Sequence, residues 1–226
     1  MSEILQNLDW SVLTGILLSI IPVLFCITIH ELAHGITAYW LGDRTAKDMG
    51  RLTLNPIKHI EIFGLLMMAV FGFGWAKPVP INMMNFKRPK RYMAVTAIAG
   101  PVSNLILAVF ILIIFGLLYT PLGGMYASQG SASGIALAMI QRTAYLSVAL
   151  AVFNMIPIPP LDGSKVLFSL VSDKTYYKLM RYERYGMILL ILFVSTAFFS
   201  STVGFAVTNL FDRLLVIAQT AYNLVN

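Results

Sequence analysis

The sequence predicts an all-α polytopic membrane protein with about four full transmembrane helices. Of its 226 residues, 58% are hydrophobic and only 12% are charged, whereas about a quarter of the residues in a soluble domain are charged. Three long runs contain neither a charged residue nor a histidine: Trp10–Ile29, Tyr92–Gln141 and Tyr185–Phe211. About 20 apolar residues cross the hydrocarbon core of a bilayer. The middle run has 50 residues, which is enough for one span and the start of another. The three runs therefore predict four spans, with one in each outer run and two that begin in the middle run.

The basic residues are unevenly distributed. The net charge is +6, and fourteen of the sixteen Lys and Arg residues lie in Gly42–Arg91 and Asp162–Arg184. Because Lys and Arg accumulate in cytoplasmic loops, we expect a multi-pass protein of the cell membrane with basic loops 42–91 and 162–184 in the cytoplasm. The N-terminus, the 120–141 connection and the C-terminal tail then face outward. Anionic lipid headgroups account for the basic charge, so it implies no nucleic-acid partner.

The first span is expected at about Trp10–Leu41. At 1.5 Å per residue this segment is longer than a hydrocarbon core of about 30 Å, so it must tilt, kink near Pro22 or protrude. No basic residue precedes it, and we therefore expect an uncleaved signal rather than a cleavable signal peptide. Cys26 is the only cysteine, which excludes a disulfide within one chain.

The basic loop after the first span is not predicted to be one helix. Residues 50–56, GRLTLNP, alternate like a strand before a turn, and residues 76–82, AKPVPIN, must be extended because prolines restrict themselves and their neighbours. Between them lies Ile62–Trp75, an apolar stretch of 14 residues. That length favours a re-entrant segment over a span, and a full crossing would place one basic flank outside.

The second and third spans are expected at about Tyr92–Tyr119 and Ile135–Ile156, joined by a Gly- and Ser-rich connection. Small residues in the second span, within AIAGPVSNLILA, permit close helix packing in lipid, and Asn104 is interpreted as a packing residue that hydrogen-bonds across helices. Residues 164–184 are predicted to form an amphipathic helix on the membrane surface. The fourth span is expected at about Tyr185–Phe211, followed by a short amphipathic tail helix from Asp212.

The first span contains the motif HELAH. Positions i and i+4 share one face of a helix, so His30 and His34 can both direct imidazole nitrogens at one Zn²⁺. Glu31 then lies beside the metal, where it can act as general base toward a metal-activated water. The alternative is a chance string or a structural pair of histidines. Ionisable groups inside a span are costly and usually functional, which favours the metal site.

A catalytic zinc needs a third protein ligand. Asp162, in IPIPPLDG, is the best placed carboxylate, because the prolines break the third span at its inner end and allow the chain to turn back into the bundle. Its alternative role is an N-cap for the following helix. Glu61 and Glu183, which border spans or re-entrant elements, remain weaker candidates, and His59 is interpreted as an interfacial histidine.

Four motifs together resemble the site-2 protease family of intramembrane zinc metalloproteases, in its compact prokaryotic form. They are HELAH, GWAKPVPIN, AGPVSNL and NMIPIPPLDG, in family order over about residues 10–165. The resemblance implies that His30, His34 and Asp162 bind one Zn²⁺ per chain and that Glu31 is the catalytic base. It implies that Asn154 binds the substrate backbone or the oxyanion, although the residues alone would favour helix packing for Asn154. It also implies a substrate-aligning β-hairpin formed by residues 50–55 and 78–82.

The expected reaction is peptide-bond hydrolysis within or near transmembrane segments of membrane-protein substrates. Residues 1–226 are expected to form a single membrane-embedded domain with a catalytic core at about 10–165 and a C-terminal part at 166–226. No PDZ or CBS domain is recognisable in the sequence, and nothing in it specifies an oligomeric state. Two alternatives stay open: a membrane metallopeptidase with Glu61 or Glu183 as third ligand, and a transporter or proton relay that performs no hydrolysis.

Overall fold

The structure, a computed structural model, describes residues 10–62, 64, 76–128 and 130–225. Among these residues there are helices and short 3-10 turns but no strand, which confirms the all-α class. Four helices are long and apolar enough to cross a membrane, as predicted. The α-helices are α2 (Trp10–Trp40), α3 (Thr45–Asp48), α5 (Pro89–Tyr119), α6 (Ala132–Asn154), α7 (Asp162–Phe168), α8 (Asp173–Tyr182), α9 (Gly186–Val194) and α10 (Ala197–Asn223). The 3-10 turns are η1 (Pro56–His59), η2 (Met83–Asn85), η3 (Gly124–Tyr126) and η4 (Glu183–Tyr185).

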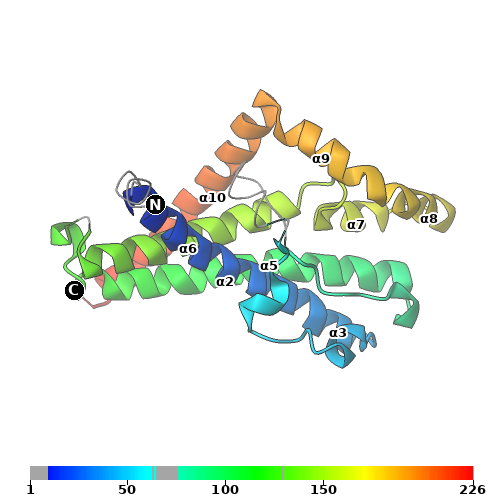
Figure 1. Cartoon of the computed structure of the whole chain (residues 1–226), viewed down its shortest axis with the longest axis horizontal. Helices are drawn as coiled ribbons and strands as arrows, with labels where there is room; N and C mark the ends of the chain where they lie inside the picture. The colour runs from blue at the N-terminus through cyan, green and yellow to red at the C-terminus, as the bar shows by residue number, and fades with distance from the viewer. Residues whose placement is uncertain (1–9, 63, 65–75, 129, 226) are drawn as a thin grey trace, which may run out of the picture.

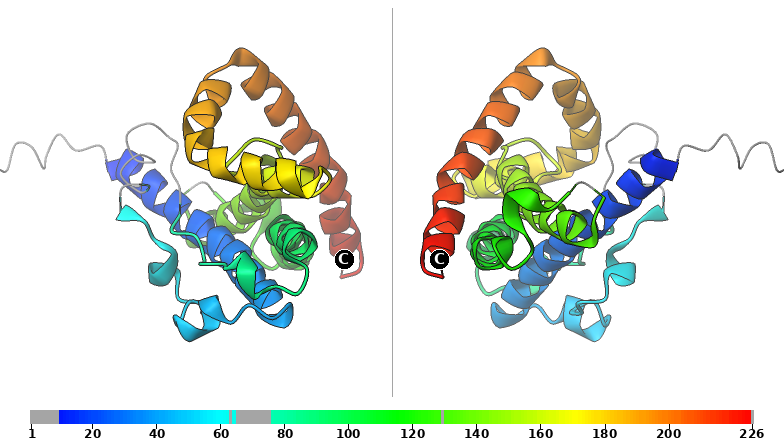
Figure 2. Two further views of the ribbon diagram at one scale, coloured as in Figure 1. Left: turned by 90° about the vertical axis from the view of Figure 1, so that its right-hand side faces the viewer. Right: turned by 90° about the vertical axis from the view of Figure 1, so that its left-hand side faces the viewer.

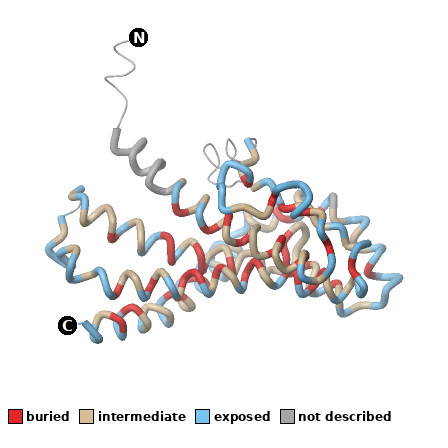
Figure 3. Tube along the Cα trace, turned by 90° about the horizontal axis from the view of Figure 1, so that it is seen from below, coloured by how far each residue is buried: buried red, intermediate tan, exposed pale blue. Residues whose placement is uncertain are grey.

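The centre of the molecule is a bundle in which α2, α5 and α6 contact one another and α10 covers α5 and α6 (Figure 1). Small side chains permit this packing. A Cβ at Gly116 of α5 would lie 2.9 Å from the Ala221 Cβ of α10, so a larger residue would push the helices apart. In lipid, helices associate through such close contacts. Buried positions recur along the whole length of the bundle (Figure 3). The largest buried cluster contains Ala108, Leu112, Ala144, Val148, Val207, Phe211 and Ala218.

The two ends of the bundle carry different elements. Helices α3, α7 and α8 gather at one end, whereas the connection between α5 and α6 and the C-terminus lie at the other (Figure 1). Both predicted cytoplasmic loops therefore meet at the same end, which is the arrangement that the predicted sidedness requires. The connection between these loops is direct, because the Lys90 ammonium donates to the Val171 carbonyl and lies 3.3 Å from the Asp173 carboxylate.

The predicted fourth span, Tyr185–Phe211, has the wrong boundaries. The helix breaks between α9 and α10, which meet at an apex (Figures 1 and 2). Thr196 causes the break by capping α10, since its hydroxyl accepts a hydrogen bond from the Phe199 N–H at 3.1 Å. The predicted tail helix from Asp212 is also wrong, because α10 continues through Asp212 to Asn223. Hydropathy did not reveal the break because Ser195 and Thr196 are surrounded by apolar residues on both sides.

The amphipathic helix predicted for residues 164–184 is two helices, α7 and α8, because the chain turns between Ser169 and Ser172. The predicted β-hairpin is not found among the described residues, where segments 50–55 and 78–82 have irregular backbone. The two segments do meet, because Arg51 donates to the Lys77 carbonyl at 3.0 Å. The re-entrant segment predicted for Ile62–Trp75 lies outside the described residues, apart from Ile62 and Gly64.

Asp43 joins the end of α2 to the segment before α5. Its side chain is fully buried and accepts hydrogen bonds from the Asn82 N–H at 2.7 Å, the Asn85 amide at 2.7 Å and the Thr45 hydroxyl at 2.5 Å. Burial by itself would raise the pKa of this carboxyl, but the hydrogen bonds from Thr45, Asn85 and Asn82 outweigh it and lower the pKa below its usual value. The carboxylate thereby holds the extended segment 76–82 in place beside α2.

Candidate metal centre and active site

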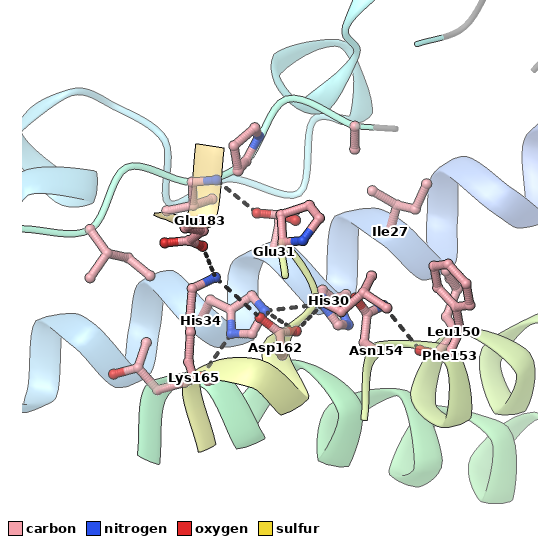
Figure 4. Close-up of a pocket in the computed structure, with 18 of the residues that line it drawn as sticks. Ile27, His30, Glu31, His34, Leu150, Phe153, Asn154, Asp162, Lys165 and Glu183 are labelled. Atoms are coloured by element: carbon pink, nitrogen blue, oxygen red, sulfur yellow. Dashed lines mark hydrogen bonds and ion pairs between the residues drawn. The ribbon is translucent and has the colours of Figure 1, made fainter. Parts of the chain in front are cut away.

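His30, His34 and Asp162 form the one group of potential metal ligands found among the described residues. The two imidazole Nε2 atoms lie 3.0 Å apart, and each lies 3.1 Å from Asp162 Oδ2. Ligands of a tetrahedral Zn²⁺ with bonds of 2.0–2.1 Å are separated by about 3.3 Å. All three residues are buried. The structure thus brings together the three predicted ligands, with a donor set and spacing that fit Zn²⁺ (Figure 4).

The histidines come from one face of α2, and α5 covers that face closely. A Cβ added to Gly100 of α5 would lie 2.5 Å from His34 Nε2 and 2.6 Å from His30 Cε1. Cβ atoms do not approach ring atoms so closely without displacing them. Glycine is therefore required at this position, because only it allows α5 to pack against both imidazoles.

Asp162 reaches the histidines because the chain reverses after α6. Residues 155–161 form a tight turn, and α7 begins at Asp162. A Cβ on Gly163 would lie 2.5 Å from the Met155 carbonyl carbon, so the following residue must be glycine for the turn to close. The N-cap position belongs to Leu161. The alternative role of Asp162 as an N-cap is therefore wrong, and its carboxylate faces the imidazoles.

The remaining ring nitrogen of each histidine is also bonded. His34 Nδ1 lies 2.7 Å from the Thr96 carbonyl, so Nδ1 carries the proton and Nε2 presents its lone pair to the metal position. His30 Nδ1 lies 3.3 Å from the Asn104 side-chain amide. Asn104 is fully buried, and its Oδ1 has no partner among the described residues. The amide atom that faces His30 is Nδ2. When His30 Nδ1 carries the proton, as metal binding through Nε2 requires, the flipped amide lets Oδ1 accept that proton.

Asn104 is thus more than the packing residue that the sequence suggested. Its backbone carbonyl does join α5 to α6, by accepting from the Ser147 hydroxyl at 2.7 Å, but its side chain also contacts His30, a candidate metal ligand. The sequence feature that could have indicated this contact is the spacing between Asn104 and Gly100. The two residues are one helical turn apart, so the helix face that approaches the imidazoles also carries Asn104.

Glu31 follows His30 on α2 but is turned away from the three ligands, because successive helix residues differ by about 100° around the axis. Its Oε2 accepts a hydrogen bond from the Val79 N–H at 2.7 Å. The segment that contains Val79 thus lies across the site opposite α5. Glu31 is half-buried, and its carboxylate points into the same cavity as the metal ligands (Figure 4).

The cavity beside the metal ligands has a volume of about 420 Å³. Its polar lining includes the candidate ligands, Glu31, Asn154, Lys165 and Glu183, and much of the remaining wall is apolar, with Ile27, Val79, Ile81, Leu150, Phe153, Met187 and Leu190. Such a wall suits an apolar polypeptide segment. Asn154 also lines the cavity, but its amide nitrogen donates to the Leu150 carbonyl of its own helix at 3.0 Å.

Lys165 is a cavity residue that the sequence analysis missed. Its ammonium lies 3.7 Å from a Glu183 carboxylate oxygen and 3.9 Å from Asp162 Oδ1. Glu183 therefore faces a lysine and is not in the ligand group. Glu61 caps a turn by accepting from the Gly64 N–H at 2.6 Å and is likewise not in that group. His59, interpreted as interfacial, is instead buried, with Nε2 3.0 Å from the Thr53 carbonyl.

Comparisons with known proteins bear on the family of the chain. The sequence model of peptidase family M50 matches residues 18–199. YwhC of Bacillus subtilis (strain 168), which carries the name of a zinc metalloprotease, is 42% identical over 177 residues that cover 78% of this chain and 80% of that protein. Rip2 of Mycolicibacterium smegmatis, which carries the same kind of name, is 29% identical over 178 residues that cover 76% of this chain and 64% of Rip2. No solved structure matches the chain.

Proposed function

We propose a catalytic mechanism for this chain from the premise that it belongs to peptidase family M50, the site-2 protease family. It is an intramembrane zinc metalloprotease that hydrolyses peptide bonds within or near transmembrane segments of membrane proteins. The observation that carries the residue assignment is the convergence of His30, His34 and Asp162, with ligand atoms 3.0–3.1 Å apart.

His30, His34 and Asp162 hold Zn²⁺ in this proposal, one ion per chain. The chemistry that Zn²⁺ supplies in such a site is Lewis acidity, which activates water near neutral pH. Glu31 acts as general base. Its Oε2 is held by the Val79 N–H, so Oε1 takes the proton from the attacking water and delivers it to the leaving amine.

Asn154 is proposed to stabilise the negative charge that develops on the substrate carbonyl oxygen. Its position on the cavity wall supports this role. To donate to an oxyanion, its amide must exchange the bond to the Leu150 carbonyl for one to substrate. Removing one side-chain amide donor from an oxyanion site costs about 2.7–4 kcal/mol of transition-state stabilisation.

The substrate is proposed to be a single membrane helix that unwinds locally. Peptide bonds in an intact membrane helix are hydrogen-bonded and shielded, so part of the helix must open before attack. An extended stretch can then lie along segment 76–82, which lines the cavity with Ala76, Pro78, Val79 and Ile81. The apolar cavity wall suits the side chains of such a stretch.

We also propose a single domain over residues 1–226, with the catalytic core in 10–165. The packing of α10 on α5 and α6 supports one unit. The chain is a multi-pass membrane protein. Its proposed orientation places the N-terminus outside and loops 42–91 and 162–184 in the cytoplasm, so cleavage occurs toward the cytoplasmic side. No observation in the described part of the chain favours a transporter or proton relay.

The test is incubation of the purified protein with a panel of single-span membrane proteins, with and without a zinc chelator. We expect cleavage sites within or next to apolar segments, identified by mass spectrometry. Chelation should abolish cleavage, and added Zn²⁺ should restore it. Glu31→Gln should bind zinc but cleave nothing. Cleavage that persists without metal, or full activity of Glu31→Gln, would refute the mechanism.

A further inference from the structure

Val79 has an unusual position as a hydrogen-bond donor. It lies between Pro78 and Pro80, and proline has no backbone N–H. The Val79 N–H is therefore the one backbone donor in these three residues, and it donates to Glu31 Oε2 at 2.7 Å. The prolines also restrict the backbone on both sides of Val79. A single donor in a stiff segment thus contacts the proposed general base.

Arg51 lies on the other side of the same segment. Its side chain donates from one guanidinium nitrogen to the Lys77 carbonyl at 3.0 Å and to the Pro78 carbonyl at 3.3 Å. Arg51 is only 8% exposed. Within the described residues no carboxylate lies at ion-pair distance from it, and its Nε has no hydrogen-bond partner. A buried cation without a paired anion is costly, so its charge needs compensation from farther away.

The Pro78 carbonyl and the Val79 N–H belong to one peptide group. This peptide bond is trans, so the C=O and the N–H point to opposite sides. The Arg51 cation therefore contacts the oxygen end of the peptide dipole, and the Glu31 anion contacts its hydrogen end. Each charge polarises the peptide in the same direction, which strengthens the hydrogen bond at the other end.

We propose that Arg51 is a positioning residue for Glu31 and acts through the Pro78–Val79 peptide group. This inference rests on the proposed role of Glu31 as general base. Arg51 polarises and immobilises the peptide, and the Val79 N–H in turn holds Glu31 Oε2. The carboxylate then presents Oε1 to the cavity in one orientation. The charges of buried Arg51 and half-buried Glu31 compensate each other through the peptide dipole.

Neighbouring contacts keep this peptide from rotating. The Lys77 N–H donates to the His59 carbonyl at 2.9 Å, and the Asn82 N–H donates to Asp43 at 2.7 Å. The segment is thus anchored on both sides of Val79. Arginine suits the position better than lysine, because a guanidinium stays charged and is less strongly hydrated than an ammonium, so it is easier to bury.

The first test is a hydrogen-bond measurement that requires no substrate. Protein labelled with ¹³C-carbonyl proline and ¹⁵N-valine gives three Pro–Val amide signals, because the sequence contains three such pairs, Pro22–Val23, Pro78–Val79 and Pro101–Val102. The Val79→Ala variant identifies the Val79 signal by its loss. A short N–H···carboxylate bond shifts the amide proton downfield. We expect both Glu31→Gln and Arg51→Gln to move the Val79 signal upfield.

The other two signals serve as the folding control, since a misfolded variant would move all three. Arg44→Gln is the matched substitution, because Arg44 lies in the same loop with its side chain 66% exposed, and it should move none. Arg51→Lys should cause a smaller shift than Arg51→Gln. If the Val79 amide signal does not shift in a folded Arg51→Gln variant, the proposal is overturned. The amide shift can be measured even if the chain cleaves no substrate. A failure of this proposal can therefore be told apart from a failure of the proposed function.

The second test is kinetic. A misplaced catalytic group costs up to about 100-fold in rate, so we expect Arg51→Gln to lower kcat about 10- to 100-fold with KM within about twofold. Arg51→Lys should recover part of the loss, zinc content should stay at one per chain, and Arg44→Gln should keep the original activity. If KM rises as much as kcat falls, Arg51 serves substrate binding instead and the proposal is wrong.

Discussion

His34 Nε2 and Asp162 Oδ2 lie 3.1 Å apart although 128 residues separate them in the sequence. Two features of the fold produce this contact. The α5 helix approaches α2 closely at Gly100, and the chain turns back after α6 so that α7 starts at Asp162. Every residue proposed to act on substrate lies around this contact.

Asp162→Ala should abolish stoichiometric zinc binding, because two imidazoles leave one protein ligand too few for a catalytic zinc site. Glu183→Ala is the control, since Glu183 lines the same cavity but faces Lys165 at 3.7 Å. It should retain about one zinc per chain. Metal content after dialysis, measured by mass spectrometry, distinguishes the two. Equal zinc loss in both variants would mean that the third ligand is misassigned.

Asn104→Leu should weaken zinc binding about 10- to 100-fold, because outer-sphere partners of a ligating histidine contribute that much to metal affinity. Leucine fills a similar volume but cannot accept the proton of His30 Nδ1. Competition with a fluorescent chelator measures the affinity. The Co²⁺-substituted protein should also show a changed visible spectrum, since the ligand geometry shifts. Unchanged affinity and spectrum would restore Asn104 to a packing role.

Asn154→Ala should separate catalysis from metal binding. Loss of one oxyanion donor lowers kcat by about 100-fold or more, while zinc affinity should stay at the original value because Asn154 bonds to Leu150 and not to a metal ligand. The measurement is kcat on a cleaved substrate together with chelator competition. An unchanged kcat would show that the residue serves helix packing.

Gly100→Ala should displace the imidazoles, because its Cβ would lie 2.5 Å from His34 Nε2. We expect zinc affinity to fall at least about 10-fold, a loss comparable with that of an outer-sphere partner. Gly204→Ala is the matched control, since a Cβ there meets nothing within 4 Å, and an exposed helical Gly→Ala change is usually stabilising by up to about 1 kcal/mol. Full zinc affinity in Gly100→Ala would contradict the proposed close approach of α5.

Asp43→Asn should reduce the free energy of unfolding by about 2 kcal/mol at neutral pH, because the charged hydrogen bonds to segment 82–85 are weakened. The pKa of Asp43 is lowered in the folded protein. Its stabilisation is therefore fully present above the unfolded value of about 3.9 and is lost as the pH falls through the folded pKa. Thermal unfolding of both proteins in detergent should show a constant difference from neutral pH to about pH 4 and a shrinking one below. A difference that grows in acid would refute this sign.

Much of the fold was predictable because hydrophobic length has a direct physical meaning in a membrane. The first three spans were placed to within three residues at each end. The fourth was not, because Thr196 ends one helix and caps the next through a local hydrogen bond to Phe199, which a hydropathy average does not detect. The strand-like alternation of residues 50–56 was likewise misleading, because alternation records which side chains are apolar and not which backbone groups pair.

The candidate site was likewise predictable only in part. The sequence by itself determined that His30 and His34 share a face and that a broken third span ends in a carboxylate, because the helix repeat and the covalent restriction of proline are local properties. Only the tertiary structure decided that Asp162 and not Glu183 faces the histidines, that Asn104 contacts His30 and that Arg51 lies behind the peptide that holds Glu31. Those contacts depend on how the helices pack and where the loop returns. Residue type and spacing alone do not reveal that placement.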